Sequence, residues 1–177
     1  MDLPVLHTAR LILDAMTEAD WPVVQAEWGD LDVARMTATV KADWSEGEAR
    51  AWIQDRATPS AEGVSYAIRR KSDRRLLGSI GMGGTPMNLG YLLGRDWWGQ
   101  GYASEAVGAF LTDAYARRPQ LDVIEAGVFD DNPASARVLQ KNGFLRVGVG
   151  NCTSLSRIEP AANSLYRLNR AQFEAHT

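Results

Sequence analysis

Residues 88–117 contain a strand pattern, a glycine loop and a helix pattern in direct succession, and this stretch limits the possible folds more than any other. Residues 89–93 form an apolar run of strand length, and the loop W-G-Q-G-Y-A follows at residues 98–103. Small and apolar residues then recur at helical spacing at Ala103, Ala106, Val107, Phe110, Leu111 and Ala114. Because the first amides of a helix have no internal acceptor and the helix dipole favours an anion there, the stretch predicts a phosphate site.

Two common phosphate-binding motifs do not fit this loop. Gly94 and Gly99 have the glycine spacing of a Walker A loop, which then needs lysine and serine or threonine. Gln100 and Gly101 occupy those two positions instead. A dinucleotide fingerprint, G-x-G-x-x-G/A, fits at its first two glycines but has Ser104 at the third small position, and the loop lies past the middle of the chain. A tight turn into a helix, without any ligand, is the other interpretation.

A third pattern, Q/R-x-x-G-x-G/A, matches the loop at Gly101 and Ala103 and differs from it at Trp98. A second motif, N-P-A-S-A-R-V-L-Q-K-N-G-F, follows at residues 132–144. With T-A-R-L-I-L near the start and S-L-Y-R-L near the end, these motifs resemble the RimJ/RimL-like ribosomal-protein alanine and serine acetyltransferases. That group is a branch of the GCN5-related N-acetyltransferase (GNAT) superfamily, in which the first pattern binds the diphosphate of acetyl-CoA.

The composition argues against several other classes of protein. The net charge of −3 gives no general attraction to nucleic acid or to an anionic membrane, and the single cysteine, Cys152, permits no intrachain disulfide. His7 and His176 lie near opposite ends, and no Cys/His cluster has metal-ligand spacing. No signal-peptide core or membrane-length apolar run is found. We expect a cytoplasmic protein without a metal, a nucleic-acid partner or a membrane partner, and interpret the basic residues at 69–75 as a solvated hairpin tip.

The resemblance implies an α/β (α+β) fold with one GNAT-like domain over residues 1–177. We expect a mixed, mostly antiparallel sheet of seven strands with splayed central strands, and about four helices. The strands are predicted at residues 10–13, 64–69, 76–82, 89–93, 121–129, 144–149 and 164–168. Thr17 and Ser45 are expected to cap the first two helices, and residues 30–44 to form a loop or a short helix.

The resemblance also implies that acetyl-CoA binds in the gap between the splayed strands. In the family, the strand before the loop carries a bulge, and the pantetheine arm pairs with its backbone at the positions of Tyr91, Leu92 and Leu93. A backbone N–H near Leu92 would be the oxyanion donor. The remaining cofactor-binding residues implied by the motifs are Trp98, Gly99, Gln100, Gly101, Tyr102, Ala103, Asn132 and Ser135. Helix capping explains Asn132 without a ligand.

The catalytic candidates come from the second motif and from the acidic residues. Many superfamily members carry a tyrosine on the second-motif helix as the donor to the leaving thiolate, but Leu139 has that position here. The branch can use the serine of N-x-x-S, which is Ser135; a bond to local backbone is its alternative role. Glu105 and Glu159 are the candidates for the general base, although Glu105 also suits the first turn of a helix.

The expected reaction is direct attack of an amine on acetyl-CoA, without an enzyme nucleophile. A peptide α-amino group has a pKa of ~8, against ~10.4 for lysine, so without a strong base an α-amine is the preferred acceptor. Met36 and Trp44 lie where relatives form the acceptor wall. The alternatives are a small amine, such as an antibiotic, polyamine or amino acid, and a CoA-binding module without turnover. The oligomeric state is left open, with a homodimer among the options.

Overall fold

The computed structural model describes residues 3–60 and 63–176, which form one eight-stranded sheet in the order β1-β2-β3-β4-β5-β6-β8-β7. Neighbouring strands are antiparallel except for β5 and β6, which are parallel. The expected mixed, mostly antiparallel sheet is therefore confirmed, with one strand more than predicted. The strands are β1 (Leu6–His7), β2 (Leu11–Asp14), β3 (Gly63–Arg70), β4 (Leu76–Gly83), β5 (Asn88–Leu93), β6 (Val123–Phe129), β7 (Leu145–Cys152) and β8 (Ala161–Asn169).

The described residues also form α1 (Trp21–Val23), α2 (Leu31–Ala34), α3 (Glu46–Arg56), α4 (Tyr102–Arg117), α5 (Pro133–Lys141) and α6 (Arg170–His176). The short α2 and the terminal α6 account for the excess over the four helices expected. Ser45 and Glu48 form the predicted capping box at α3: the Glu48 carboxylate accepts from the Ser45 N–H at 2.9 Å. The first predicted helix consists of three consecutive segments: a 3-10 turn η1 (Glu18–Asp20), the α-helical α1 and a π-helical segment η2 (Val24–Trp28).

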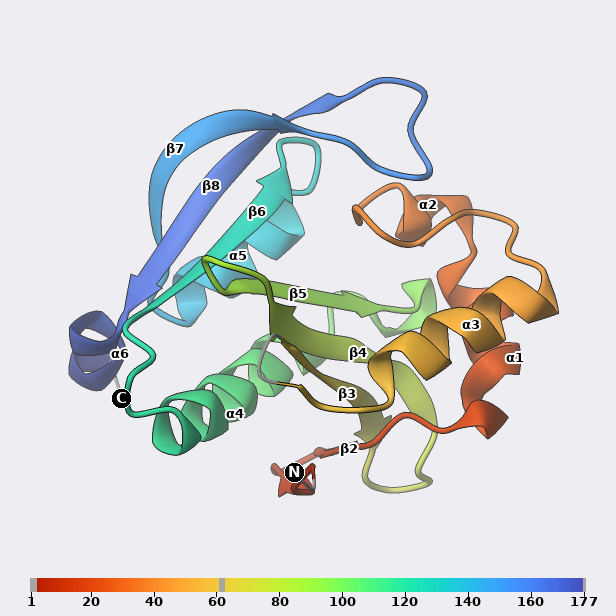
Figure 1. Ribbon diagram of the computed structural model, residues 1–177, viewed down its shortest axis with the longest axis horizontal. Coiled ribbons are helices and arrows are strands. Elements are labelled where there is room, and N and C mark those ends of the chain that lie inside the picture. The colour runs from red at the N-terminus through yellow and green to blue at the C-terminus, as the bar shows by residue number, and fades with distance from the viewer. Residues whose placement is uncertain (1–2, 61–62, 177) are drawn as a thin grey trace.

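The helices cover both faces of the sheet (Figure 1). The helices α4 and α5 lie behind it in this view, whereas α1, α2 and α3 lie in front. The core behind the sheet includes Tyr66 edge-on to Phe110, with ring centroids 5.9 Å apart. The core in front is centred on tryptophans, and Trp28 and Trp44 each pack against Trp52.

The sheet separates between β5 and β6. These strands are paired in register only at Asn88 and Glu125, where the Glu125 N–H donates to the Met87 carbonyl at 2.9 Å. Each strand is fully paired on its other side, β5 to β4 and β6 to β8. The two parts of the sheet are thus joined at one rung and diverge beyond it, which confirms the expected splay. The expected bulge is wrong, because the β4–β5 register runs without a shift.

The tip of the basic hairpin is exposed at Lys71, Arg74 and Arg75, as interpreted, but Arg69 is not part of the solvated tip. Arg69 is only 8% exposed. Its guanidinium donates to Asp14 at 2.7 Å and to both carboxylate oxygens of Asp20, at 2.9 and 2.8 Å. This buried network ties β3 to β2 and to the segment that leads into α1.

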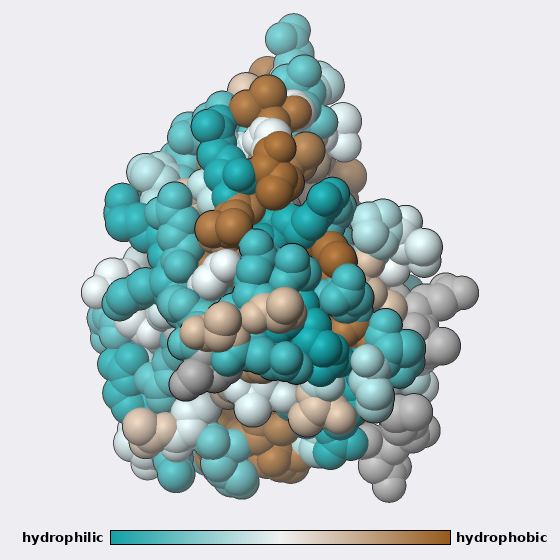
Figure 2. All heavy atoms as spheres, turned by 90° about the vertical axis from the view of Figure 1, so that its left-hand side faces the viewer, coloured by the Kyte–Doolittle hydropathy of each residue, from teal (hydrophilic) through white to brown (hydrophobic). Residues whose placement is uncertain are grey.

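The edge strand β7 carries exposed apolar side chains, which form a band on the face shown in Figure 2. Leu145, Val147 and Val149 are 55%, 52% and 68% exposed, and Leu165 of β8 is 40% exposed. A search of the described residues for a helix long and apolar enough to cross a membrane found none.

Candidate active site

A cavity of about 1280 Å³ lies where β5 and β6 diverge. On one side it is lined by the start of α4 and by α5, and we call this the α4–α5 side. On the other it is lined by the segment after α2, by β6 and by β8, and we call this the α2 side. Most of the residues expected to bind a ligand line this cavity; Gln100, Glu105, Glu159 and Trp44 are outside its lining.

The loop before α4 presents free amides to the cavity. Gly99 and Gly101 have φ of 73° and 81°, in the left-handed region that favours glycine. The first intrahelical bond runs from the Glu105 N–H to the Gly101 carbonyl. The amides of residues 101–104 donate to no group in the described part of the chain. They form a cluster of donors at the positive end of a helix, as the sequence predicts.

Glu105 braces this loop from outside the cavity. Its carboxylate accepts from the Thr8 hydroxyl at 2.6 Å, from the Arg10 N–H at 2.8 Å and from Arg10 Nε at 2.7 Å. Arg10 also donates to the Gln100 carbonyl at 2.9 Å. Burial raises the pKa of Glu105, but the hydrogen bonds from Thr8 and Arg10 outweigh it and lower the pKa overall. Glu105 is therefore a fully engaged anion rather than a base poised at neutral pH.

Trp98, where the family pattern has glutamine or arginine, supports the strand. Its indole N–H donates to the Leu93 carbonyl at 2.9 Å. Gln100, by contrast, turns away from the cavity, and its side-chain amide donates to the Asp96 carbonyl at 2.8 Å.

The pairing of β5 determines which backbone amides near Leu92 face the gap. Hydrogen-bonded residues alternate along an antiparallel ladder, and the Gly94 N–H donates to the Leu77 carbonyl of β4 at 2.8 Å. The alternation directs the amide of Leu92 towards β4. The amides of Tyr91 and Leu93 point into the gap instead, so these two can act as donors there.

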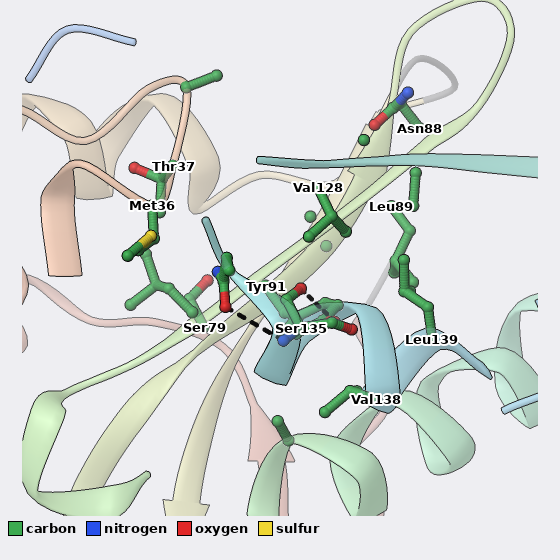
Figure 3. A pocket seen from close by; sticks show the side chains of 18 of the residues that line it. Met36, Thr37, Ser79, Asn88, Leu89, Tyr91, Val128, Ser135, Val138 and Leu139 are labelled. Carbon is green, nitrogen blue, oxygen red and sulfur yellow. Dashed lines mark hydrogen bonds between the residues drawn. The ribbon is translucent and has the colours of Figure 1, made fainter. Parts of the chain in front are cut away.

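Tyr91 and Ser135 meet inside the cavity (Figure 3). The phenol oxygen lies 2.7 Å from Ser135 Oγ and 3.0 Å from the Ser135 carbonyl. Asn132 caps α5 by accepting from the Ser135 N–H at 3.2 Å, which fixes the position of the serine. Burial raises the pKa of the Tyr91 phenol above its ordinary value, so it is a neutral hydrogen-bond donor at pH 7. No pattern along the chain indicated this phenol contact. Leu139 is fully buried in the core.

Met36 and Thr37 lie across the cavity from Tyr91 and Ser135 (Figure 3). The second acceptor-wall candidate, Trp44, is 6% exposed and belongs to the tryptophan core. Glu159 is exposed and is not among the residues that line the cavity. The structure thus brings Met36, but neither Trp44 nor Glu159, to the site.

The connection between β7 and β8 clasps the segment that follows α2. The Ser156 hydroxyl accepts from the Ala42 N–H at 2.8 Å and donates to the Val40 carbonyl at 3.0 Å. The Leu155 N–H donates to the Ala38 carbonyl at 3.2 Å. We call these contacts the 156 clasp. They join segments more than a hundred residues apart, which no local pattern could reveal.

Arg157 extends this closure to the end of β6. It donates to both oxygens of Asp131, at 2.8 and 3.0 Å, and to the Arg35 carbonyl at 2.8 Å. The hydrogen bond from Arg157 lowers the pKa of Asp131, so this carboxylate remains charged. The end of α2, the end of β6 and the β7–β8 connection therefore meet at the rim of the α2 side.

Two cations on α5 also line the α4–α5 side. Arg137 and Lys141 are one helical turn apart, exposed, and without an acidic partner in the described part of the chain. Their i, i+4 spacing on the second-motif helix was the signal that could have identified them. No group of three metal-ligating side chains was found among the described residues.

Comparisons with known proteins show that this chain is similar to acetyltransferases. Residues 10–145 match the family model of the acetyltransferase (GNAT) domain. The chain is 31% identical over 153 residues to the uncharacterized N-acetyltransferase YoaA of Bacillus subtilis, which covers 82% of this chain and 85% of that protein. It is 33% identical over 157 residues to the uncharacterized N-acetyltransferase p20 of Bacillus licheniformis, covering 81% and 86%.

Solved structures share the fold at lower identity. A GNAT-family acetyltransferase from Bacillus anthracis superposes with a TM-score of 0.81 at 20% identity, over 94% of this chain and 98% of that one. RimL, a ribosomal alpha-N-protein acetyltransferase in complex with coenzyme A, gives 0.78 at 20% identity over the same shares. A Salmonella typhimurium acetyl transferase that modifies the N-terminal serine of a ribosomal protein gives 0.77 at 21%, over 94% and 99%.

Proposed function

The chain belongs to the GNAT family of N-acetyltransferases, and on this premise we propose that it transfers an acetyl group from acetyl-CoA to the α-amino group of a peptide or protein. The observation that carries this proposal is the row of free amides at residues 101–104, facing a cavity at the point where two strands separate.

The α4–α5 side fits the coenzyme. The free amides suit a diphosphate, and a Cβ at Gly99 would meet nothing within 4 Å, so the backbone there can be approached closely. Arg137 and Lys141 add positive charge for the phosphates. The unpaired edge of β5 offers backbone groups to the pantetheine amides, as an added strand would.

When bound, acetyl-CoA supplies an activated thioester carbonyl. The amide of Tyr91 or of Leu93 polarises its oxygen from the β5 edge, and the acceptor nitrogen forms the new bond as the C–S bond breaks. The cavity holds both partners in place, which removes much of the entropic barrier. Cys152 lines the cavity but has no part in this direct attack.

Ser135 is the proposed proton donor to the leaving sulfur, and it regains a proton from the attacking nitrogen, which loses one as the amide forms. Tyr91 is its positioning residue. The phenol has one proton, which either Ser135 Oγ or the Ser135 carbonyl can accept; when Oγ accepts it, the serine proton is free to point elsewhere in the cavity. The raised pKa of the phenol keeps Tyr91 in its donating form. This pair would do the work of the tyrosine that Leu139 replaces.

The charges that line the cavity support this acceptor class. Every carboxylate among the described lining residues is in an ion pair with arginine: Asp55 with Arg56, Glu125 with Arg167, and Asp131 with Arg157. These pairs leave no net negative charge among them to favour a polycation, and none of the three is an unpaired carboxylate that could serve as a base. An amine that is already partly neutral at pH 7, such as a peptide α-amine with a pKa of ~8, suits such a site.

A panel of acceptors tests the proposal, with CoA thiol release as the readout. The panel holds peptides with free N-termini, Nα-blocked lysine peptides, a polyamine, an aminoglycoside and free amino acids. Free N-termini should react at least about tenfold faster than blocked lysine peptides at pH 7.5, because more of their amine is neutral. Faster turnover of lysine or of a small polycation would contradict the acceptor assignment. Calorimetric uptake of acetyl-CoA with no turnover of any amine would favour a binding module instead.

A further inference from the structure

Asn163 on β8 is a buried polar residue without a role in the chemistry above. It is 6% exposed and lines the cavity. Its Oδ1 is buried and has no hydrogen-bond partner in the described part of the chain, and no described group accepts from its Nδ2. Because unpaired buried amides are rare and destabilising, such a group points to a ligand or to a bound water.

Two glycines make room for this amide. A Cβ at Gly127 of β6 would lie 2.9 Å from Asn163 Nδ2, and one at Gly150 of β7 would lie 3.1 Å from Oδ1. The amide is therefore fitted between the neighbouring strands, where larger residues would displace it. This fit holds the amide between the strands, with Nδ2 beside the cavity-lining Gly127 and Oδ1 beside Gly150. A half-turn of the amide about its Cβ–Cγ bond exchanges the two atoms, so that either can pair with a group in the cavity.

Asn163 belongs to the α2 side of the cavity. Side chains alternate between the faces of a strand, and Ser164 and Tyr166 lie with Pro133 and Ala136 of α5. Asn163 and Leu165 therefore face the opposite way, away from the helix that would support the coenzyme. Asn163 pairs in register with Phe129, two residues before Asp131 on the rim.

The primary amide of asparagine has an NH₂ group that donates and an oxygen that accepts. It therefore matches a ligand group that can both accept and donate a hydrogen bond. A peptide unit does so, with its N–H and its C=O, whereas a polyamine or an ammonium group does not. We propose that Asn163 determines acceptor specificity by pairing with the first peptide group behind the attacking α-amine. This inference rests on the proposed function and narrows its acceptor from any α-amine to one followed by a peptide bond.

The test compares a peptide acceptor with its depsipeptide analogue, in which an ester oxygen replaces the first peptide N–H. The wild-type protein should favour the peptide by about tenfold in kcat/KM, because the ester leaves the Asn163 acceptor unpaired. Asn163→Leu keeps the size of the side chain and removes its polar atoms, so its preference should fall to about one. The Kd for acetyl-CoA, measured by calorimetry, should stay within twofold.

Asn151→Leu is the matched control, since it makes the same change at an exposed position of β7 outside the cavity. It should retain the wild-type preference. Equal rates on both acceptors in the wild-type protein would overturn the Asn163 assignment, even if Asn163→Leu failed to fold, and would leave α-amine acetylation intact. A preference that persisted in Asn163→Leu would also overturn it and would assign the amide to a bound water. Turnover of lysine or polyamines alone would overturn the proposed function together with this inference.

Discussion

The α4–α5 side and the α2 side of the cavity are built from different kinds of contact. On the α4–α5 side the anion donors come from consecutive residues, 101–104, at the start of one helix. On the α2 side the wall is assembled from the segment after α2, β6, β7 and β8, and the β7–β8 connection holds it from outside the cavity. The first arrangement is local in sequence, and the second exists only after the chain has folded.

Local contacts suit the binding of a coenzyme, which all members of a family share. Contacts between distant segments suit recognition of the acceptor, which differs between members. A helix start binds a diphosphate by backbone groups, so side chains around it can vary with little consequence. A wall made by side chains from four segments can change with any one of them. Perturbing the two sides separately should therefore change coenzyme affinity and acceptor affinity independently.

The largest effect should come from Asp20→Asn, which removes one partner from the buried network of Arg69, Asp14 and Asp20, outside both sides of the cavity. Removing one partner from the buried Arg69 network leaves a buried positive charge and should cost about 3–5 kcal/mol of unfolding free energy. Burial raises the pKa of Asp20, but the hydrogen bonds from Arg69 and Thr17 outweigh it and lower the pKa. Asp20 thus adds stability above its unfolded pKa of ~3.9, and this is lost as pH falls through the lower folded pKa.

Thermal and urea unfolding between pH 3 and pH 7 would measure this loss of stability and its dependence on pH. The variant should be less stable at pH 7 and should lose less stability on acidification than the wild-type protein. Asp73→Asn, which breaks an exposed pair with Arg70, is the control and should change the Tm far less. Equal losses of stability in the two variants would show that the buried network stabilises the fold no more than an exposed ion pair does.

The next effect should come from Gly101→Val on the α4–α5 side. At φ of 81° a branched side chain is strained, so the backbone of the loop must shift, although the Cβ itself would make only an ordinary contact, 3.4 Å from Arg10 Nη2. Calorimetry should give a Kd for acetyl-CoA about thirtyfold higher, which corresponds to about 2 kcal/mol. Gly47→Ala, where a Cβ meets nothing within 4 Å, should leave the Kd unchanged. Unchanged affinity in Gly101→Val would argue that these amides do not hold the coenzyme.

A smaller effect, confined to the acceptor, should come from Ser156→Ala. This change breaks the 156 clasp and leaves the Ala42 N–H and the Val40 carbonyl without a partner, at about 1–3 kcal/mol. The KM for a peptide acceptor should rise about fivefold to tenfold, while the Kd for acetyl-CoA stays within twofold. Ser72→Ala, on the exposed turn of the β3–β4 hairpin, serves as the control. A rise in both the KM for the acceptor and the Kd for acetyl-CoA would mean that the α2 side and the α4–α5 side are coupled rather than independent.

The smallest effect should come from Lys141→Ala. An exposed charge near a phosphate contributes about 1 kcal/mol at low salt, so the Kd for acetyl-CoA should rise about threefold to fivefold. The difference should disappear near 1 M salt, where the Debye length is about 3 Å. A difference that persisted at high salt would indicate a packed, specific contact instead.

The sequence was informative where structure depends on neighbours along the chain. The Ser45–Glu48 box, the Asn132 cap and the glycine loop each follow from residues within one turn or one loop. It misplaced Trp44 and Arg69, because burial of a tryptophan or an arginine depends on distant partners such as Trp52 and Asp20. It had no signal for the 156 clasp or for Asn163, whose surroundings are set by strand pairing across the sheet. It placed the oxyanion donor near Leu92 but could not say which amide, because only the β4–β5 register shows that those of Tyr91 and Leu93 face the gap.

A crystal structure of the protein grown with acetyl-CoA would show where the diphosphate and the pantetheine arm bind. We predict diphosphate oxygens within hydrogen-bonding distance of the amides of residues 101–104, and the pantetheine arm along the open edge of β5 with its sulfur near Ser135. A coenzyme bound elsewhere, with these amides facing only water, would contradict the account.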